Sequence, residues 1–153
     1  MAGNRKEILV EVFCDVLENL AFMFAEAIED EEVRQTPEAY LVARMRFAGP
    51  MRGALRLAAP TPMCTEIAAN VLGLDPEDAM VATGSEDALK ELLNVTCGHV
   101  LTALAGEEPV FDLSVPDVSA LPERGWSELA QSDDTVAFLV DDYVVLLQLS
   151  IDN

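Results

Sequence analysis

Residues 89–105 read LKELLNVTCGHVLTALA, a stretch with helical periodicity and two different faces. Each helical residue advances about 100° around the axis, so one stripe of side chains is predicted to face the core. This stripe comprises Leu89, Leu93, Thr96, Cys97, Val100 and Leu104. The opposite stripe carries two polar side chains followed by small residues only, namely Glu91, Asn94, Gly98, Thr102 and Ala105. It is low in relief, so another surface could approach the helix backbone closely.

Two residues of this second stripe lower the stability of the helix. A glycine in the middle of a helix costs about 1 kcal/mol relative to alanine, and an asparagine costs about half of that or more. An exposed helix face usually carries Lys, Glu, Gln or Ala instead. Either Gly98 allows close packing on another element of the same chain and Asn94 is hydrogen-bonded there, or the face is kept smooth for an external surface.

Amphipathic patterns elsewhere predict two more helices, over residues 5–30 and about 62–72. The third helix, which contains the quoted stretch, is predicted to end at Gly106. In the first helix the apolar positions recur at spacings of three and four. They are Ile8, Val12, Val16, Leu20, Met23 and Ala27.

Alternating apolar and polar residues predict hairpins over residues 39–59 and 135–151, and a single strand over 109–115. Residues 116–125 contain two prolines and a glycine and are expected to form a loop. The last strand, YVVLLQLSI, is apolar at almost every position, so both its faces are covered or it lies in the middle of a larger sheet. The predicted fold class is α+β, a single domain over residues 1–153 in which three helices pack against an antiparallel sheet.

Basic residues are few and are concentrated in the first predicted hairpin. Four of the nine lie there, and they are Arg44, Arg46, Arg52 and Arg56. Two interpretations are open. The hairpin carries either a solvated sheet face whose arginines pair with nearby acids, or a site for an anion or a partner.

Composition excludes several functional classes. The chain of 153 residues is 51% hydrophobic, so it is expected to fold, and its formal net charge of −19 disfavours binding to nucleic acid and to anionic membranes. Neither a signal peptide nor a transmembrane segment is recognisable in the sequence. The three cysteines, Cys14, Cys64 and Cys97, are an odd number at scattered spacings and are expected to be reduced thiols of a cytoplasmic protein.

The residues Glu91, Asn94 and Gly98 resemble the E-x-x-N…G motif of the CheC/CheX/FliY family of response-regulator phosphatases, and most narrowly that of the CheX-like domain. The resemblance extends to the Asp87-Ala88 pair before the motif and to the order of the predicted elements. It also includes the G-x-L-x-L strand at residues 53–57, the helix that begins at Pro62, and the apolar terminal hairpin.

This resemblance implies a CheC-like fold and hydrolysis of the aspartyl phosphate of a CheY-like receiver domain. By position, Glu91 would form a salt bridge with the receiver's active-site lysine, and Asn94 would position the attacking water. Gly98, Thr102 and Ala105 would form the docking surface. No cofactor of its own is implied, because the receiver supplies Mg²⁺. A homodimer is implied as well.

The sequence departs from the family pattern at two places. CheC-type proteins usually carry two motifs, but here Asn19 is preceded three residues earlier by Val16 instead of glutamate, so one site is expected. His99 follows the glycine where family members often have asparagine. It is the only histidine, and it is predicted to flank the site or to be partly buried instead of acting as a base. For the same reason no histidine-cluster metal site is expected.

Two other functions remain open at this point. The chain could be a non-catalytic module that binds receivers or acts as a dimeric adaptor in a signalling pathway. It could also be a small-molecule sensor or a structural dimer without receiver contact, with the apolar final strand extending a sheet across two subunits.

Overall fold

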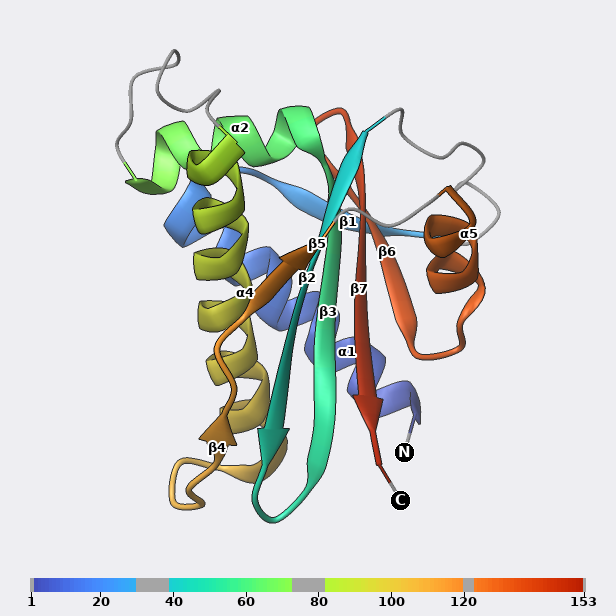
Figure 1. The fold of residues 1–153 in the computed structure, drawn as a ribbon. Coiled ribbons are helices and arrows are strands. Elements are labelled where there is room, and N and C mark those ends of the chain that lie inside the picture. The colour runs from blue at the N-terminus through green and yellow to red at the C-terminus, as the bar shows by residue number, and fades with distance from the viewer. Residues whose placement is uncertain (1, 30–38, 73–81, 120–122, 153) are drawn as a thin grey trace.

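A seven-stranded antiparallel sheet forms the centre of the computed structural model, which describes residues 2–29, 39–72, 82–119 and 123–152 (Figure 1). The strands are β1 (Ala25–Ile28), β2 (Tyr40–Ala48), β3 (Arg52–Pro60), β4 (Asp112–Leu113), β5 (Asp117–Ser119), β6 (Thr135–Val140) and β7 (Tyr143–Ile151). Their order across the sheet is β1-β6-β7-β3-β2-β4, with β5 also paired to β2. The fold is therefore α+β with an antiparallel sheet, as the sequence predicted.

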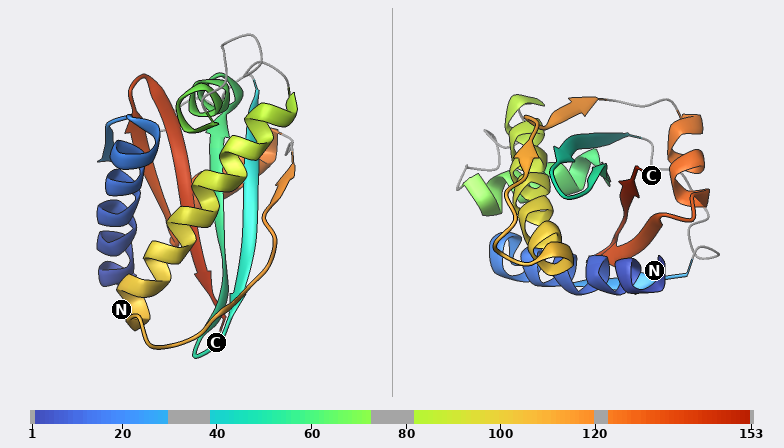
Figure 2. Two further views of the ribbon diagram at one scale, coloured as in Figure 1. Left: turned by 90° about the vertical axis from the view of Figure 1, so that its left-hand side faces the viewer. Right: turned by 90° about the horizontal axis from the view of Figure 1, so that it is seen from below.

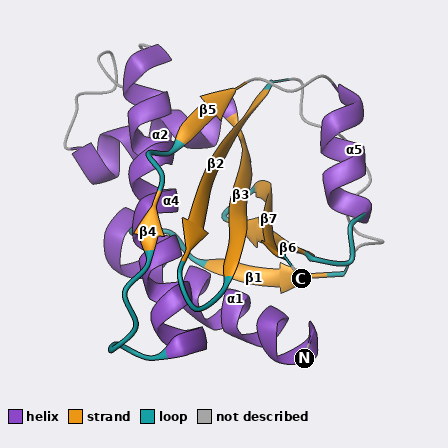
Figure 3. Ribbon diagram, turned by 60° about the horizontal axis from the view of Figure 1, so that its bottom comes forward, coloured by secondary structure: helices purple, strands orange, loops and turns teal. Residues whose placement is uncertain are grey.

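Helices cover both faces of this sheet. They are α1 (Ala2–Val16), which continues as a π-helical turn η1 (Leu17–Ala21), α2 (Thr61–Leu72), α4 (Ala82–Ala105) and α5 (Glu123–Gln131). Among the described helices, α1, α2 and α4 share one face of the sheet, and α5 lies on the other face, as Figure 2 and Figure 3 show. In the described part of the chain there are thus four α-helices where three were predicted.

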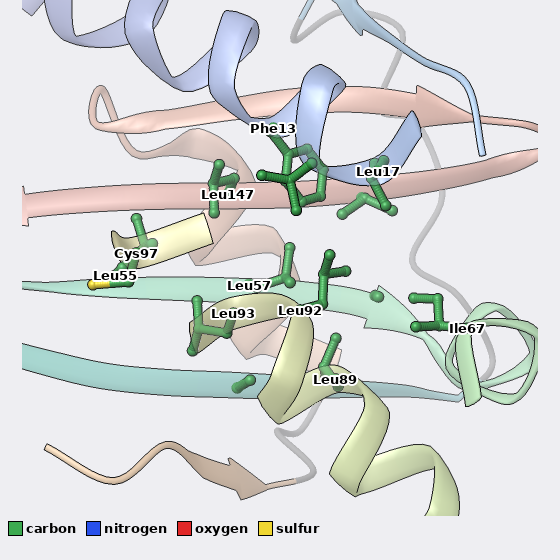
Figure 4. Close-up of a cluster of buried hydrophobic side chains, with 14 of the residues drawn as sticks. Phe13, Leu17, Leu55, Leu57, Ile67, Leu89, Leu92, Leu93, Cys97 and Leu147 are labelled. Atoms are coloured by element: carbon green, nitrogen blue, oxygen red, sulfur yellow. The ribbon is translucent and has the colours of Figure 1, made fainter. Parts of the chain in front are cut away.

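The main core lies between the sheet and the face formed by α1, α2 and α4. Figure 4 shows Phe13 from α1, Ile67 from α2 and Leu89 from α4 pointing toward Leu57 of β3 and Leu147 of β7. The predicted core stripe of α4 is confirmed, because all its members are buried except Leu104, which is half-buried. Its polar member is satisfied within the helix, since the Thr96 hydroxyl donates to the Leu92 carbonyl oxygen at 2.7 Å.

The first predicted helix is too long. The helix ends at Ala21 because Phe22 adopts a left-handed conformation with φ of 57°, and the next residues form β1 instead of more helix. Strand β1 pairs with β6, a partner more than 100 residues away that helical periodicity cannot reveal. The buried stripe is also displaced. It comprises Leu9, Phe13, Val16 and Leu17, while Ile8, Val12 and Leu20 are half-buried at its margin.

For residues 109–125, the predicted strand is right only in part and the predicted loop is wrong. The strand predicted over residues 109–115 is reduced to the two residues of β4. The predicted loop over 116–125 contains β5 and the start of α5. Helix α5 buries Trp126 and Leu129 against the outer face of the sheet, where Tyr40 packs edge-on against Trp126 at 4.9 Å between ring centroids.

The hairpin predicted over residues 135–151 is confirmed. Strands β6 and β7 pair from Thr135–Gln148 to Val140–Tyr143, and Asp141 takes a positive φ of 52° in the two-residue turn. Strand β7 lies between β6 and β3, with Leu147 facing the main core and Leu146 facing α5. Because both its edges are paired, β7 cannot extend a sheet into a second subunit, and that part of the dimer hypothesis is wrong.

Candidate functional site

Helix α4 presents Glu91 and Asn94 to solvent from the middle of its length. Both side chains are exposed, while their neighbours Leu92 and Leu93 are fully buried on the opposite side of the helix. A spacing of three residues puts the two groups on one face, with a rise along the axis of about 4.5 Å. The buried stripe anchors α4 to the sheet, so the pair projects from a rigid platform.

Neither of the two polar side chains is engaged within the described part of the chain. No hydrogen bond or ion pair joins Glu91 or Asn94 to any other described residue. A carboxylate and an amide that stand free at the surface can bind a foreign group without first breaking an internal contact. The interpretation in which Asn94 is satisfied inside the protein is therefore wrong.

Gly98 leaves open space beside the pair. A Cβ atom added to this residue would meet no atom within 4 Å, apart from its own neighbours in the helix. The interpretation in which Gly98 allows close packing on another element of the same chain is therefore wrong. One turn further, Thr102 is exposed and Ala105 is half-buried, and the helix ends where Gly106 takes a φ of 86°.

An apolar groove of about 540 Å³ runs beside this face, between α1 and α4. Val12, Val16 and Val95 line it, and His99 and Asn19 also contribute to its wall. His99 is exposed, so it flanks the site as predicted but is not partly buried. This groove could not be predicted from the sequence, because its existence depends on how α1 packs against α4. The one sign of it in the sequence is Val95, an apolar residue beside the stripe that contains Gly98 and Thr102.

The first helix offers no second exposed pair. The Asn19 side chain donates from Nδ2 to the Asp15 carbonyl oxygen at 2.9 Å, within its own helix. Val16, at the position where a second motif would have glutamate, is buried. The Asn19 amide is thus held against the backbone, whereas the Asn94 amide is free.

The thiols are unsuited to nucleophilic chemistry. Burial raises the pKa of the Cys64 thiol to about 12 and that of the Cys97 thiol to about 11. For Cys14, burial together with Asp15 and Glu18 raises the pKa as well, and its Sγ lies 3.3 Å from the Ala25 carbonyl oxygen. All three therefore stay protonated at neutral pH, and a thiol attacks only as the thiolate.

Two negative findings concern the described residues alone. Within them, no group of three or more His, Cys, Asp or Glu side chains is arranged to hold a metal ion. Nor does any helix there combine the length and apolar character needed to cross a membrane.

A family model and several solved structures both relate this chain to CheX proteins. The family model described as chemotaxis phosphatase CheX matches residues 41–136, which is more than half of the chain and includes all of α4. No curated protein sequence matches the chain.

Similar solved structures include the chemotaxis protein CheX from Desulfovibrio desulfuricans, with 14% identity and a TM-score of 0.69 over 97% of this chain and 99% of that one. CheX from Vibrio vulnificus has 16% identity and a TM-score of 0.70 over 99% of each chain. The CheX–CheY–BeF₃–Mg²⁺ complex from Borrelia burgdorferi gives 13% identity and a TM-score of 0.66 over 96% of this chain and 97% of that one. At such identities these structures establish a shared fold.

Proposed function

Since the chain belongs to the CheX family of chemotaxis phosphatases, we propose that it hydrolyses the aspartyl phosphate of a CheY-like receiver domain, and that Glu91 and Asn94 carry this activity. One observation carries the proposal. Within the described residues, an acid and an amide stand free and exposed, one turn apart, on a helix whose other side is buried. The open space beside Gly98 supports docking of a second protein over the pair.

The reaction requires little from the protein beyond positioning of the attacking water. An aspartyl phosphate is an activated acyl phosphate, so water can displace the aspartate once it is held in line with the bond that breaks. The water forms a bond to phosphorus, the bond between phosphorus and the aspartate oxygen breaks, and inorganic phosphate leaves with the protons of the water. An amide both donates and accepts hydrogen bonds, so Asn94 can orient this water without acting as a base.

Glu91 has a separate role in this proposal. Its carboxylate pairs with the lysine of the receiver's active site, which holds the receiver in register over Asn94. Complementary charges across an interface fix its register and speed association. Gly98, Thr102 and Ala105 continue the same face with small side chains, and we assign them to the docking surface.

We propose that the metal of the reaction belongs to the receiver and not to this protein. The Borrelia structure, a complex of CheX with CheY, BeF₃ and Mg²⁺, is consistent with this assignment of the metal to the receiver. The Mg²⁺ ion would neutralise phosphoryl charge on the receiver, while this chain contributes the amide and the carboxylate.

We further propose that the protein acts as a homodimer in the cytoplasm, within a two-component pathway. Large apolar side chains are exposed near both edges of the sheet. Phe22 and Phe24 are 72% and 70% exposed beside β1, and Val110 and Val115 are each 83% exposed beside β4. Apolar side chains grouped at a sheet edge support a contact between subunits.

The activity is tested by adding small amounts of the protein to an excess of phosphorylated receiver and following the loss of phosphate. A catalyst shortens the lifetime of the phosphorylated receiver at one molecule of protein per fifty of receiver. A receiver that binds but keeps its ordinary lifetime would instead establish the adaptor function and refute the phosphatase.

A further inference from the structure

Four arginines gather on the outer face of the sheet, opposite the face that carries α4. They project from the two strands of one hairpin, Arg44 and Arg46 from β2 and Arg52 and Arg56 from β3. Together with parts of β4 and β7 they line a hollow of about 640 Å³. This volume is within the range of about 300–1,000 Å³ that small-molecule sites occupy.

The position of the hollow follows from how α5 covers the sheet. Helix α5 packs on one end of the outer face, over Val42, Ala58 and Leu146. Arg44, Arg56 and Gln148 follow two residues along the same strands, on the same face, where no described helix covers them. Seen from below, the sheet curves around the side that carries α5 (right panel of Figure 2).

The register of the hairpin brings like charges together. Arg44 lies directly opposite Arg56, a cross-strand arrangement that puts the two Cβ atoms about 5 Å apart and is unfavourable for equal charges. Of the acidic residues that the structure describes, only Asp112 and Asp152 line the hollow beside the four arginines, and Asp117 is paired with Arg44 from β5. The hollow is thus positively charged in a chain with a formal net charge of −19.

One donor in the hollow is buried without an acceptor. The Nε atom of Arg44 is inaccessible to solvent, and no described residue accepts its hydrogen bond. Burial and the guanidinium groups of Arg46 and Arg56 also lower the pKa of Arg44. A buried donor without an acceptor is costly for the folded chain, and the outer nitrogens of the same guanidinium have no described partner either.

These observations contradict the first interpretation of the hairpin, a solvated sheet face whose arginines pair with nearby acids. In the described part of the chain, none of the four guanidinium groups forms an ion pair or a hydrogen bond, although the backbone N–H of Arg46 donates to the Ser114 hydroxyl at 2.8 Å. The side chains between them are small, Ala48, Ala54, Ser114 and Ser150, and leave room for a ligand.

We propose that this arginine hollow binds a small molecule that carries two or more phosphate groups. Arg44 and Arg56 face each other and can hold one phosphate from two sides with bidentate hydrogen bonds. Arg46 is two residues, or about 7 Å, further along β2 and, together with Arg52, can hold a second phosphate. Phe47 turns its ring into the main core, so the hollow offers phosphate recognition without an aromatic ring to stack on a base.

The site is independent of the proposed phosphatase reaction, because it lies on the other face of the sheet from Glu91 and Asn94. Isothermal titration calorimetry with inorganic pyrophosphate, in a metal-free buffer, tests it on the full chain. We expect saturable binding of one pyrophosphate, with an affinity that falls at least tenfold in Arg44→Gln and in Arg56→Gln. Each variant removes one of two opposed like charges, so the fold is expected to remain intact.

The matched control is Arg5→Gln, which removes the same charge from α1 on the opposite face of the sheet and is expected to change the affinity less than twofold. Sulfate at equal ionic strength is expected to bind at least tenfold more weakly than pyrophosphate, because it bears one anionic group. Absence of saturable binding at millimolar pyrophosphate would overturn the proposal. An affinity for pyrophosphate that falls as much in Arg5→Gln as in Arg44→Gln would also overturn it. So would an Arg56→Gln variant that loses self-association in a protein that binds no pyrophosphate.

Discussion

Gly98 is the residue at which folding stability and the proposed function have opposite requirements. Its Cβ position is open, so alanine fits there without displacing any neighbour. We therefore expect Gly98→Ala to raise the free energy of unfolding by about 1 kcal/mol, because alanine is the better helix former. The added methyl group would lie in the docking surface and weaken receiver binding severalfold.

Urea unfolding and the KM for phosphorylated receiver measure the two effects in the same preparation. A variant that is more stable and equally active would remove Gly98 from the docking surface. Loss of both stability and activity would mean that the glycine serves the fold.

Helix α5 is the element that was hardest to predict from the sequence. It has nine residues, and Pro122 and Gly125 near its start are typical of a loop. Its only strong apolar signal is Trp126 with Leu129, three residues apart. By contrast, α4 has 24 residues and shows its periodicity over several turns, so its core stripe could be predicted correctly.

The role of α5 is tested through Trp126, the only tryptophan of the chain. It is 2% exposed, and its backbone N–H donates to the Tyr40 hydroxyl at 3.0 Å. We expect Trp126→Ala to lower the free energy of unfolding by about 3–5 kcal/mol. Trp126→Phe should cost much less, because the indole Nε1 has no acceptor among the described residues and little hydrogen bonding is lost.

Urea unfolding followed by far-ultraviolet circular dichroism gives both values without relying on tryptophan fluorescence. An alanine variant as stable as the wild type would show that α5 does not contribute to the fold.

The same contrast between local and distant determinants applies to the candidate site. Exposure of Glu91 and Asn94 could be predicted, because it depends only on the rotation of one helix. The groove beside them could not, because it forms where α1 meets α4. Strand β1 was missed for a similar reason. Residues 25–28 continue an apolar helical pattern, and only their pairing with β6 makes them a strand.

For the whole molecule, the buried thiols predict how stability depends on pH. Burial raises the pKa of Cys64 from its ordinary 9.0 to about 12, so the folded state holds this proton more tightly than the unfolded state. The corresponding stability is complete below pH 9 and is lost as the pH rises toward 12. At pH 11 the loss amounts to on the order of 2–3 kcal/mol.

Burial, with a smaller effect of Glu66, also raises the pKa of Tyr143, so the difference between wild type and Cys64→Ala isolates the thiol. Free energies of unfolding measured from pH 8 to 11 should fall less steeply in the variant. Parallel curves would contradict the assignment of this pH dependence to Cys64.

The proposed homodimer is also a property of the whole molecule. Strand β7 is interior, so subunits can associate only through other surfaces, and the exposed apolar side chains lie near the edges at β1 and β4. Sedimentation velocity at micromolar concentration is expected to give twice the monomer mass of 16.6 kDa. A single species at the monomer mass would refute the dimer.

The most direct test of the central claim compares two asparagines in the same chain. Asn94 is exposed and free within the described residues, whereas Asn19 is exposed but bonded to its own helix. The measurement is the rate of phosphate loss from a phosphorylated receiver in the presence of Asn94→Ala or Asn19→Ala. We expect Asn94→Ala to lose at least a hundredfold in rate and Asn19→Ala to keep the wild-type rate. Equal rates for Asn94→Ala and the wild type would contradict the account.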